Sequence, residues 1–296
     1  MIHRKVPSCA AAALIAAGLP AAAQMPDRPL VFAIDGLAAT QGSANLDGGG
    51  SFSANRLYGR AGGLYRFDAG SVGFFVSTGR IDYDFSDTTA PWGEVSDIGI
   101  SLPLRYTLGR ADIFVSPSLR YDYEEGADRE DGQTAGAFVG FGWKFSDRLT
   151  LGPAFGVFSE LESDDLNIFP AILVDWSITD RARLTTGPTI GATQGPGLAF
   201  DYAVTDRLRL GLAGRYENIR FRLDDDGPAP GGIGQDQSFP LVLTVDYEPF
   251  PGSRLVAFAG AELGGELRLE DAAGRLVETR DYDPAPIFGL AFRFGF

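Results

Sequence analysis

The side chains that most enzymes use for nucleophilic, redox or imidazole chemistry are almost missing from this sequence. There is one histidine, His3, and one cysteine, Cys9, and both precede residue 24. Disulfide bonds, thiolate catalysis, Ser-His-Asp triads and histidine metal ligands therefore cannot form in the rest of the chain. Carboxylates such as Glu160 and Glu162 could share acid-base work, but nothing places them in a pocket. We predict that the protein is not an enzyme and needs no cofactor or metal ion.

The opening residues predict a leader that is removed after export. A short positive stretch, Arg4-Lys5, precedes an apolar run from Cys9 to Ala23 that ends in three alanines. This order of charge, apolar core and small residues is typical of a secretory signal peptide. We place the signal peptide at residues 1–23 and a single domain at residues 24–296.

The charge balance argues against two classes of partner. The chain has 25 Lys and Arg against 39 Asp and Glu, a net charge of −14, and loss of Arg4 and Lys5 with the leader would make it −16. A chain this acidic is repelled by nucleic acid and by anionic lipid surfaces. We therefore expect no nucleic acid partner and no peripheral anchor on anionic lipid. Lys144 is the single lysine after the leader, so nearly all the positive charge is guanidinium.

Most of the chain follows a period of two in segments of about ten residues, which predicts β-strands. In 101–108, large apolar residues at the even positions alternate with Ser, Pro, Arg and Thr. The face opposite the large apolar residues is small, glycine-rich or charged, a pattern that favours a barrel in lipid over a soluble sandwich. No segment after the leader approaches the roughly 18 apolar residues of a membrane helix. The same alternation recurs in 137–145, 168–178, 208–213 and 241–247.

Six short turns and several long acidic connections separate these segments. Short turns at one end and long loops at the other are typical of outer-membrane barrels. The acidic loops could hold calcium or magnesium, but their spacing matches no EF-hand, and we expect solvated surfaces. The turns lie at 67–70, 108–110, 146–148, 179–181, 205–207 and 251–253, and three of them share the frame Ser/Thr-Asp-Arg.

Aromatic residues occur at a nearly constant distance before these turns. In the three Ser/Thr-Asp-Arg hairpins, a Trp or Tyr stands four residues before the turn aspartate. Aromatic rings prefer the headgroup region of a bilayer, so aligned aromatics would form an interfacial girdle. The alternative is that they are ordinary core residues. The girdle candidates are Tyr65, Tyr106, Trp143, Trp176, Tyr202 and Tyr247.

The final segment is the most specific local sign of a membrane barrel. Large apolar residues at 288, 290, 292, 294 and 296 alternate with Gly289, Ala291, Arg293 and Gly295. This resembles the terminal strand of Gram-negative outer-membrane β-barrels of a family with no characterised function. The resemblance implies the outer membrane as location, lipid as partner, and recognition of this strand by the barrel-assembly machinery. The residues it marks as the assembly signal are Phe292, Phe294 and Phe296.

The turns give twelve strands, and adding a last strand at 285–296 and a first near 30–40 makes fourteen. We therefore predict an all-β fold, a transmembrane antiparallel up-and-down barrel of about 14 strands. The first strand has the weakest alternation, and without it the alternative is a barrel of 12 strands. Closure is required because an open sheet edge in hydrocarbon leaves unpaired backbone groups.

Charged side chains on the faces away from lipid are the candidate functional residues. Charges on facing walls could form a selective constriction, or they could be ion pairs that fill and rigidify the interior. The candidates are Arg105, Arg120, Lys144, Asp175, Asp201, Arg209, Arg215, Glu217, Asp246 and Arg293.

These features leave three classes of function. We predict a passive pore for small solutes with a mixed-charge lumen, because a barrel of this size is wide enough unless a loop folds inward. The best candidates for such a loop are Gln41–Arg56 and Asp224–Gln237. The alternative is a non-conducting structural or adhesive barrel whose ion pairs block the lumen. An outer-membrane enzyme is the third class, and the missing histidine disfavours it.

Overall fold

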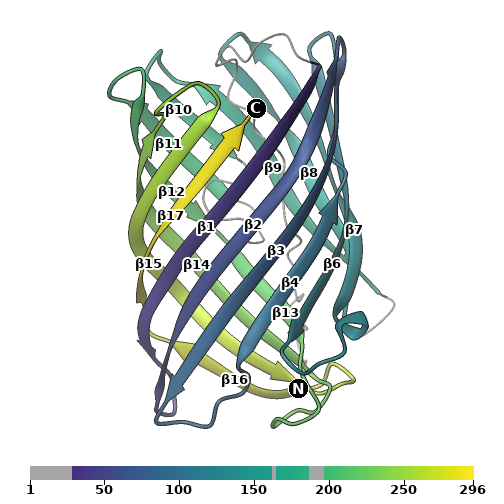
Figure 1. Ribbon diagram of the computed structural model, residues 1–296, viewed down its shortest axis with the longest axis vertical. Coiled ribbons are helices and arrows are strands. Elements are labelled where there is room, and N and C mark those ends of the chain that lie inside the picture. The colour runs from purple at the N-terminus through teal and green to yellow at the C-terminus, as the bar shows by residue number, and fades with distance from the viewer. Residues whose placement is uncertain (1–28, 162–164, 187–196) are drawn as a thin grey trace, which may run out of the picture.

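The computed structural model describes residues 29–161, 165–186 and 197–296, which form a tall β-barrel (Figure 1). The predicted signal peptide lies outside the described residues and stays a prediction. A short 3-10 helix, η1 (Arg129–Gly132), interrupts the strands. Among the described residues, no helix is both long and apolar enough to cross a membrane. The strands are β1 (Leu30–Asn45), β2 (Ser51–Phe67), β3 (Gly70–Ser86), β4 (Glu94–Ser101), β5 (Leu104–Leu108), β6 (Ala111–Glu124), β7 (Gln133–Ser146), β8 (Leu149–Ser159), β9 (Leu166–Ser177), β10 (Ala182–Thr186), β11 (Gly197–Ala203), β12 (Leu208–Arg215), β13 (Glu217–Arg222), β14 (Ile233–Tyr247), β15 (Ser253–Glu270), β16 (Leu276–Tyr282) and β17 (Ala285–Gly295).

These segments make 14 barrel strands, because three of them are interrupted. β4 and β5 both pair with β3 and β6, and the break between them contains Pro103. β16 and β17 both pair with β15, and Pro284 lies between them. Proline cannot donate a ladder hydrogen bond, which accounts for these two interruptions. β12 and β13 both pair with β14 and are separated at Tyr216. The prediction of 14 strands is confirmed.

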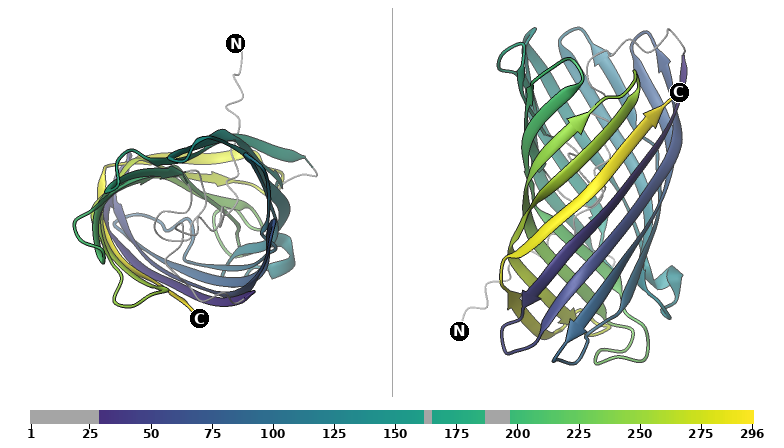
Figure 2. Two further views of the ribbon diagram at one scale, coloured as in Figure 1. Left: turned by 90° about the horizontal axis from the view of Figure 1, so that it is seen from above. Right: turned by 60° about the vertical axis from the view of Figure 1, so that its left-hand side comes forward.

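The barrel closes between its first and last strands. β1 pairs with β17 in antiparallel register from Ala33 and Gly295 to Gln41 and Ile287. The weakly alternating first segment is therefore a full barrel strand. Viewed from above, the strands surround the interior as a continuous wall (Figure 2). The predicted antiparallel up-and-down order is confirmed, because each strand pairs with its neighbours in the chain.

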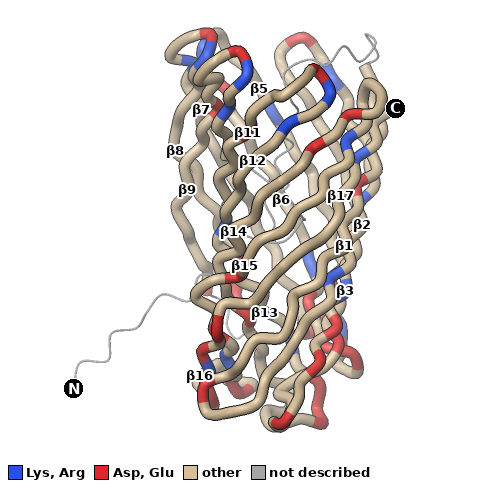
Figure 3. Tube along the Cα trace, turned by 90° about the vertical axis from the view of Figure 1, so that its left-hand side faces the viewer, with Lys and Arg blue, Asp and Glu red and all other residues tan. Residues whose placement is uncertain are grey.

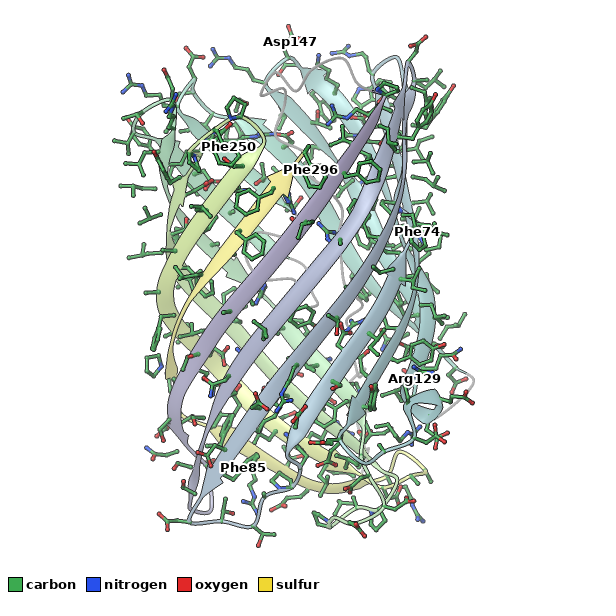
Figure 4. The ribbon with its side chains drawn as sticks, viewed as in Figure 1. Phe74, Phe85, Arg129, Asp147, Phe250 and Phe296 are labelled. Atoms are coloured by element: carbon green, nitrogen blue, oxygen red, sulfur yellow. The ribbon has the colours of Figure 1, made fainter. Side chains whose placement is uncertain are left out.

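The two ends of the barrel differ. The six short turns, Leu30 and Phe296 lie at one end, called the turn end, which is uppermost in Figure 1. The longer connections lie at the other, the loop end. In outer-membrane barrels, short turns face the periplasm and long loops face the outside. Figure 4 shows Phe250 and Phe296 near the turn end, and Phe85 and Arg129 near the loop end.

The polarity of the wall reverses between these ends. Toward the turn end the exterior is apolar and exposed, as Phe74 (51%) and Val76 (45%) show. Toward the loop end the exterior of β3 carries Arg80 and Asp82, whose side chains are 54% and 49% exposed, while Phe52 is buried inside. An apolar exterior suits lipid and a charged exterior suits water. We infer that the membrane surrounds the turn-end part and that the loop-end part projects beyond it.

The interior of the loop-end part is filled by an apolar cluster, called the loop-end core. This corrects the expectation that large apolar residues all face outward. The cluster resembles the core of a soluble protein, with small and aromatic side chains that are 0 to 8% exposed. Its members are Ala44, Leu46, Phe52, Ala54, Ile81, Tyr83, Trp92, Val95, Ile219, Phe221, Leu223, Ala229, Leu267, Leu269, Tyr282 and Ala285.

A strand that changes partners closes the wall around this core. β12 pairs with β11 as far as Arg215. Beyond it, β13 pairs antiparallel with β14 and makes one parallel bridge, from Arg222 to Tyr123 of β6. The loop-end core therefore lies within a smaller ring that contains β1 to β4, β6 and β13 to β16. Strands β7 to β9 lie outside this ring and carry their own interior apolar cluster of Phe138, Ala154, Phe158 and Phe169.

Candidate functional site in the barrel interior

Charged side chains line the interior near the turn end, in a band that we call the charged belt. Most members stand beside an exposed apolar residue on their own strand, and because side chains alternate along a strand they point inward. Where ion pairs are formed, most belt side chains are 25 to 50% exposed. Water therefore reaches this part of the interior. The belt comprises Asp35, Arg60, Arg105, Asp112, Lys144, Asp175, Arg183, Asp201, Arg209, Asp246, Arg254 and Arg293.

On one side of the barrel, the belt residues form simple ion pairs. Arg105 lies 2.9 Å from Asp112, on the neighbouring strand. Arg183 lies 2.7 Å from Asp175 and donates two hydrogen bonds to it. Lys144 reaches Asp147 in the adjoining turn at 2.9 Å. Because these side chains are partly hydrated, each pair contributes little to stability, about 0–1 kcal/mol.

On the other side, two aspartates are each shared by two arginines. Asp246 lies 2.6 Å from Arg254 and 3.8 Å from Arg209. Asp35 lies 2.5 Å from Arg60 and also accepts a hydrogen bond from Arg293. These two groups carry more positive than negative charge.

Between the belt and the loop-end core, the interior charges are buried. Arg56 donates hydrogen bonds to Glu262 and to Gln41, the latter at 3.0 Å, and all three side chains are buried. Arg120 donates to both Asp97 and Asp122, with a distance of 2.6 Å to Asp122. A buried charge that loses its partner costs about 3–5 kcal/mol. Arg56 and Glu262 therefore connect β2 to β15, and Arg120 connects β6 to the adjacent β4, at a depth that water does not reach.

Further buried groups connect this layer to the loop-end core. Asp236 accepts hydrogen bonds from the hydroxyls of Tyr83 and Tyr282, both at 3.0 Å. Both tyrosine rings belong to the loop-end core. Arg220 and Arg268 lie 2.7 and 2.6 Å from the buried Glu270. The polar layer and the apolar core are therefore one continuous packed structure.

An inserted loop completes the loop-end core. Trp92, from the connection between β3 and β4, contacts Phe221 edge-on with ring centroids 5.2 Å apart. The Glu124 carboxylate holds this loop in place, because it accepts hydrogen bonds from the backbone N–H of Gly93 at 2.7 Å and of Asp224 at 3.2 Å. Two connections therefore fold inward: 87–93 through Trp92, and 223–232 through Leu223 and Ala229. Ala229 lies in the expected segment Asp224–Gln237, whereas the expectation for Gln41–Arg56 is wrong. That segment is the end of β1, a tight turn and the start of β2.

The structure divides the sequence-derived lumen candidates between two layers. Sequence reasoning missed many of their partners, including Asp35, Arg60, Arg56 and Glu262. The alternation that placed the other charges inside also applies to these four residues and could have found them. The hydrated belt contains Arg105, Lys144, Asp175, Asp201, Arg209, Asp246 and Arg293, while Arg120, Arg215 and Glu217 lie in the buried layer.

The aromatic candidates lie on the exterior at the turn end. Tyr65, Tyr106, Trp143, Trp176, Tyr202 and Tyr247 are all 40 to 49% exposed. Each is in register with an apolar residue on a neighbouring strand, as Trp176 is with Leu184. Their role as a membrane girdle stays a prediction. Phe292 and Phe296 face outward, Phe294 packs on Phe250 with centroids 6.0 Å apart, and recognition of this strand by the assembly machinery also stays a prediction.

No metal centre is evident in this interior. Among the described residues, no group of three or more His, Cys, Asp or Glu side chains is arranged to hold a metal ion. The charged side chains are partnered chiefly by one another. The arrangement can therefore attract, repel or hold charged solutes.

The closed sheet, the apolar exterior and the charged interior define an outer-membrane β-barrel of a Gram-negative bacterium. No family model matches the chain. A solved outer membrane channel from Pseudomonas putida F1 is similar over 92% of this chain and 97% of that chain, with a TM-score of 0.52 and 13% identity. The P. putida toluene transporter TodX covers 92% of this chain and 91% of its own, with a TM-score of 0.43 and 12% identity. At 13% identity, the likeness to the outer membrane channel shows the fold.

One curated relative is also similar in sequence. It is an uncharacterised protein of Chlamydia pneumoniae, 24% identical over 147 residues, which make up 49% of this chain and 45% of the relative. The match thus spans about half the length of each protein. The comparisons support the predicted resemblance to outer-membrane barrels without a characterised function.

Proposed function

We propose that this barrel is a channel for small solutes. The observation that carries the proposal is the charged belt, most of whose side chains are 25 to 50% exposed although they lie inside the wall. A hydrated, charged interior is what a polar solute needs in order to cross hydrocarbon. The lack of histidine and cysteine after residue 23 supports a role without catalysis.

The loop-end core sets the path that solutes would take. It fills the ring formed by β1 to β4, β6 and β13 to β16. Strands β7 to β9 lie outside that ring. In this proposal, solutes pass between the belt and the outside along the β7 to β9 side.

A second function, a non-conducting structural or adhesive barrel, is favoured by the same core. Phe52 and Phe221 are 1% and 0% exposed, and Arg56 and Glu262 beneath them are also buried. A core packed this tightly across the entire interior would block ions. In that case the acidic loops at the loop end would meet a partner.

Single-channel recording in planar bilayers separates these functions. The purified barrel is first shown to be folded by its heat-dependent migration in gel electrophoresis. Steady current steps support the channel. Silence from protein that is folded and inserted contradicts the channel and supports the non-conducting barrel.

A further inference from the structure

We propose that the charged belt binds small anionic solutes through an arc of four arginines and two aspartates on six neighbouring strands. The ligands would carry carboxylate or phosphate oxygens, which guanidinium groups bind with paired hydrogen bonds. This inference rests on the proposed channel function, because it names the class of solute that the interior would accept.

The arc is a continuous part of the wall. Asp35 on β1 is in direct register with Arg60 on β2 and with Arg293 on β17. Arg293 is in register with Arg254 on β15, and the arc continues through β14 to β12. It therefore holds four arginines and two aspartates, with a net charge of +2. The six residues in spatial order are Arg60, Asp35, Arg293, Arg254, Asp246 and Arg209.

The exposed part of the arc is positive. The side chain of Asp246 is 1% exposed and that of Asp35 is 16% exposed. The arginines that cover them reach further into the interior, with 36% exposure for Arg254 and 29% for Arg293. A short carboxylate lies against the wall, and a long guanidinium side chain lies over it. A solute in the interior therefore meets guanidinium groups first.

Two of these arginines lie directly opposite each other across β15 and β17. Like charges on directly opposed residues destabilise a sheet. Arg254 donates through Nε to Asp246, and Arg293 donates through Nε to Asp35. Neither Nη atom of Arg293 donates a hydrogen bond to any of the described residues. An anion between the two guanidinium groups would accept these hydrogen bonds and remove the repulsion.

A third arginine has a donor without an acceptor. The Arg60 side chain is 5% exposed and is held by Asp35 and by the Phe75 ring, 4.7 Å from the guanidinium carbon. Its Nη1 atom is buried and has no hydrogen-bond partner among the described residues. The arc thus has more donors than its two aspartates can satisfy.

The rest of the belt does not cancel this charge. Arg105 with Asp112, Arg183 with Asp175, and Lys144 with Asp147 are neutral pairs. Asp201 adds one negative charge, so the belt together with Asp147 has a net charge of +1. The whole chain carries −14, and its acidic residues gather at the loop end (Figure 3). The arc is therefore a local positive region in an acidic protein.

Two measurements test the proposal. The first is titration calorimetry of inorganic phosphate and, separately, of citrate into the folded barrel in detergent, which distinguishes phosphate from carboxylate ligands. The second is the reversal potential of single channels in a potassium chloride gradient. The test variant is Arg254→Gln with Arg293→Gln, and Arg254→Lys with Arg293→Lys keeps the charge. The matched control is Arg80→Gln with Arg275→Gln, which removes two exposed charges outside the barrel interior.

We expect the wild-type protein and the control to bind at least one of the two anions and to prefer chloride over potassium. The Gln variant should bind that anion about tenfold more weakly, equal to about 1.4 kcal/mol, and its chloride preference should fall. The Lys variant should keep most of the chloride preference, because that property depends on charge. Loss in the Lys variant equal to loss in the Gln variant would show a structural effect and contradict the electrostatic argument.

The outcomes separate the inference from the function on which it rests. A conducting barrel that prefers potassium and binds neither anion overturns the inference and leaves the channel standing. A silent barrel that binds phosphate or citrate, with weaker binding in the Gln variant, overturns the channel and leaves the anion site standing. A barrel that is silent and binds neither anion overturns both.

Discussion

Truncation of Phe221 tests whether the loop-end core is a packed core that closes one end of the barrel. The Phe221 side chain is 0% exposed. It meets Trp92 edge-on at 5.2 Å and Tyr83 at 6.5 Å between ring centroids. Removal of a fully buried phenylalanine side chain costs about 3–5 kcal/mol, through lost burial and an unfilled cavity. We expect Phe221→Ala to lower the free energy of unfolding by this amount.

The assay is equilibrium unfolding in urea with the barrel inserted in lipid vesicles. Trp143 and Trp176 are replaced by Phe, so that the fluorescence comes from Trp92 beside the mutated position. The matched control is Phe239→Ala, because Phe239 lies on the lipid-facing exterior with 43% exposure. Lipid can fill the space left there, so we expect the control to lose about 1 kcal/mol or less. If both variants lose the same small amount, the loop-end core is not packed and the argument for closure fails.

Two further predictions concern single contacts at the loop end. A methyl group on Gly265 would lie 2.0 Å from the buried Tyr282 ring. In urea unfolding, Gly265→Ala should therefore lower the free energy of unfolding by about 1–3 kcal/mol. The control is Gly59→Ala, whose methyl group would have no atom within 4 Å and which should lower it by under about 1 kcal/mol. The backbone N–H of Arg275 donates a hydrogen bond to the Asp271 carboxylate, and this bond is the main reason that the pKa of Asp271 lies below its ordinary value of 3.8. The guanidinium of Arg275 lowers this pKa further. The charged carboxylate therefore orders this loop above that value, and the order is lost as pH falls through the lowered pKa. In the wild-type protein, we expect hydrogen exchange of the Arg275 amide, divided by its intrinsic rate, to accelerate as the pH falls through the lowered pKa of Asp271. A ratio that stays constant over this pH range would contradict the prediction. The same acceleration in the Asp271→Asn variant would also contradict it.

Much of the wall could be predicted from sequence because each strand has one face for lipid. The period of two identified the strands, and the six turns fixed their ends and their number. Pro103 and Pro284 interrupt the hydrogen-bond ladder without changing the direction of the strand, so counting turns gave the correct total of 14. Even the weakly alternating β1 belongs to the barrel, because closure requires a partner for β17.

The loop-end core could not be predicted in the same way. The period of two continues through β2 and β3, and only the polarity of the two faces exchanges. Phe52, Tyr83 and Trp92 also lie in separate elements, and no local pattern indicates that they meet. A rule that assigns every large apolar residue to lipid places these side chains outside. Along β2 and β3, the polar side chains switch from the interior face to the exterior face. This switch is the signal that would have located the membrane boundary.

Only some residues of the charged belt could be identified from the sequence, for a related reason. Arg209 and Asp246 alternate with large lipid-facing residues and were identified as interior. Asp35 and Arg254 have the same orientation, but their strands have small or buried neighbours, which weakens the alternation. The shared contacts of Asp35 and Asp246, each with two arginines, depend on which strands are adjacent. That adjacency becomes visible only in the closed barrel.

The central claim is that one face of each strand contacts lipid while the opposite face encloses an interior. It is tested most directly by fluorescence quenching with brominated lipids, using single-cysteine variants in a Cys9→Ser background. Leu243 is 68% exposed and lies beside Thr244, which is 6% exposed. We predict strong quenching of a fluorophore at Leu243→Cys, and little at Thr244→Cys or at Asp84→Cys beyond the membrane. Equal quenching at positions 243 and 244, or stronger quenching at position 84, would contradict the account.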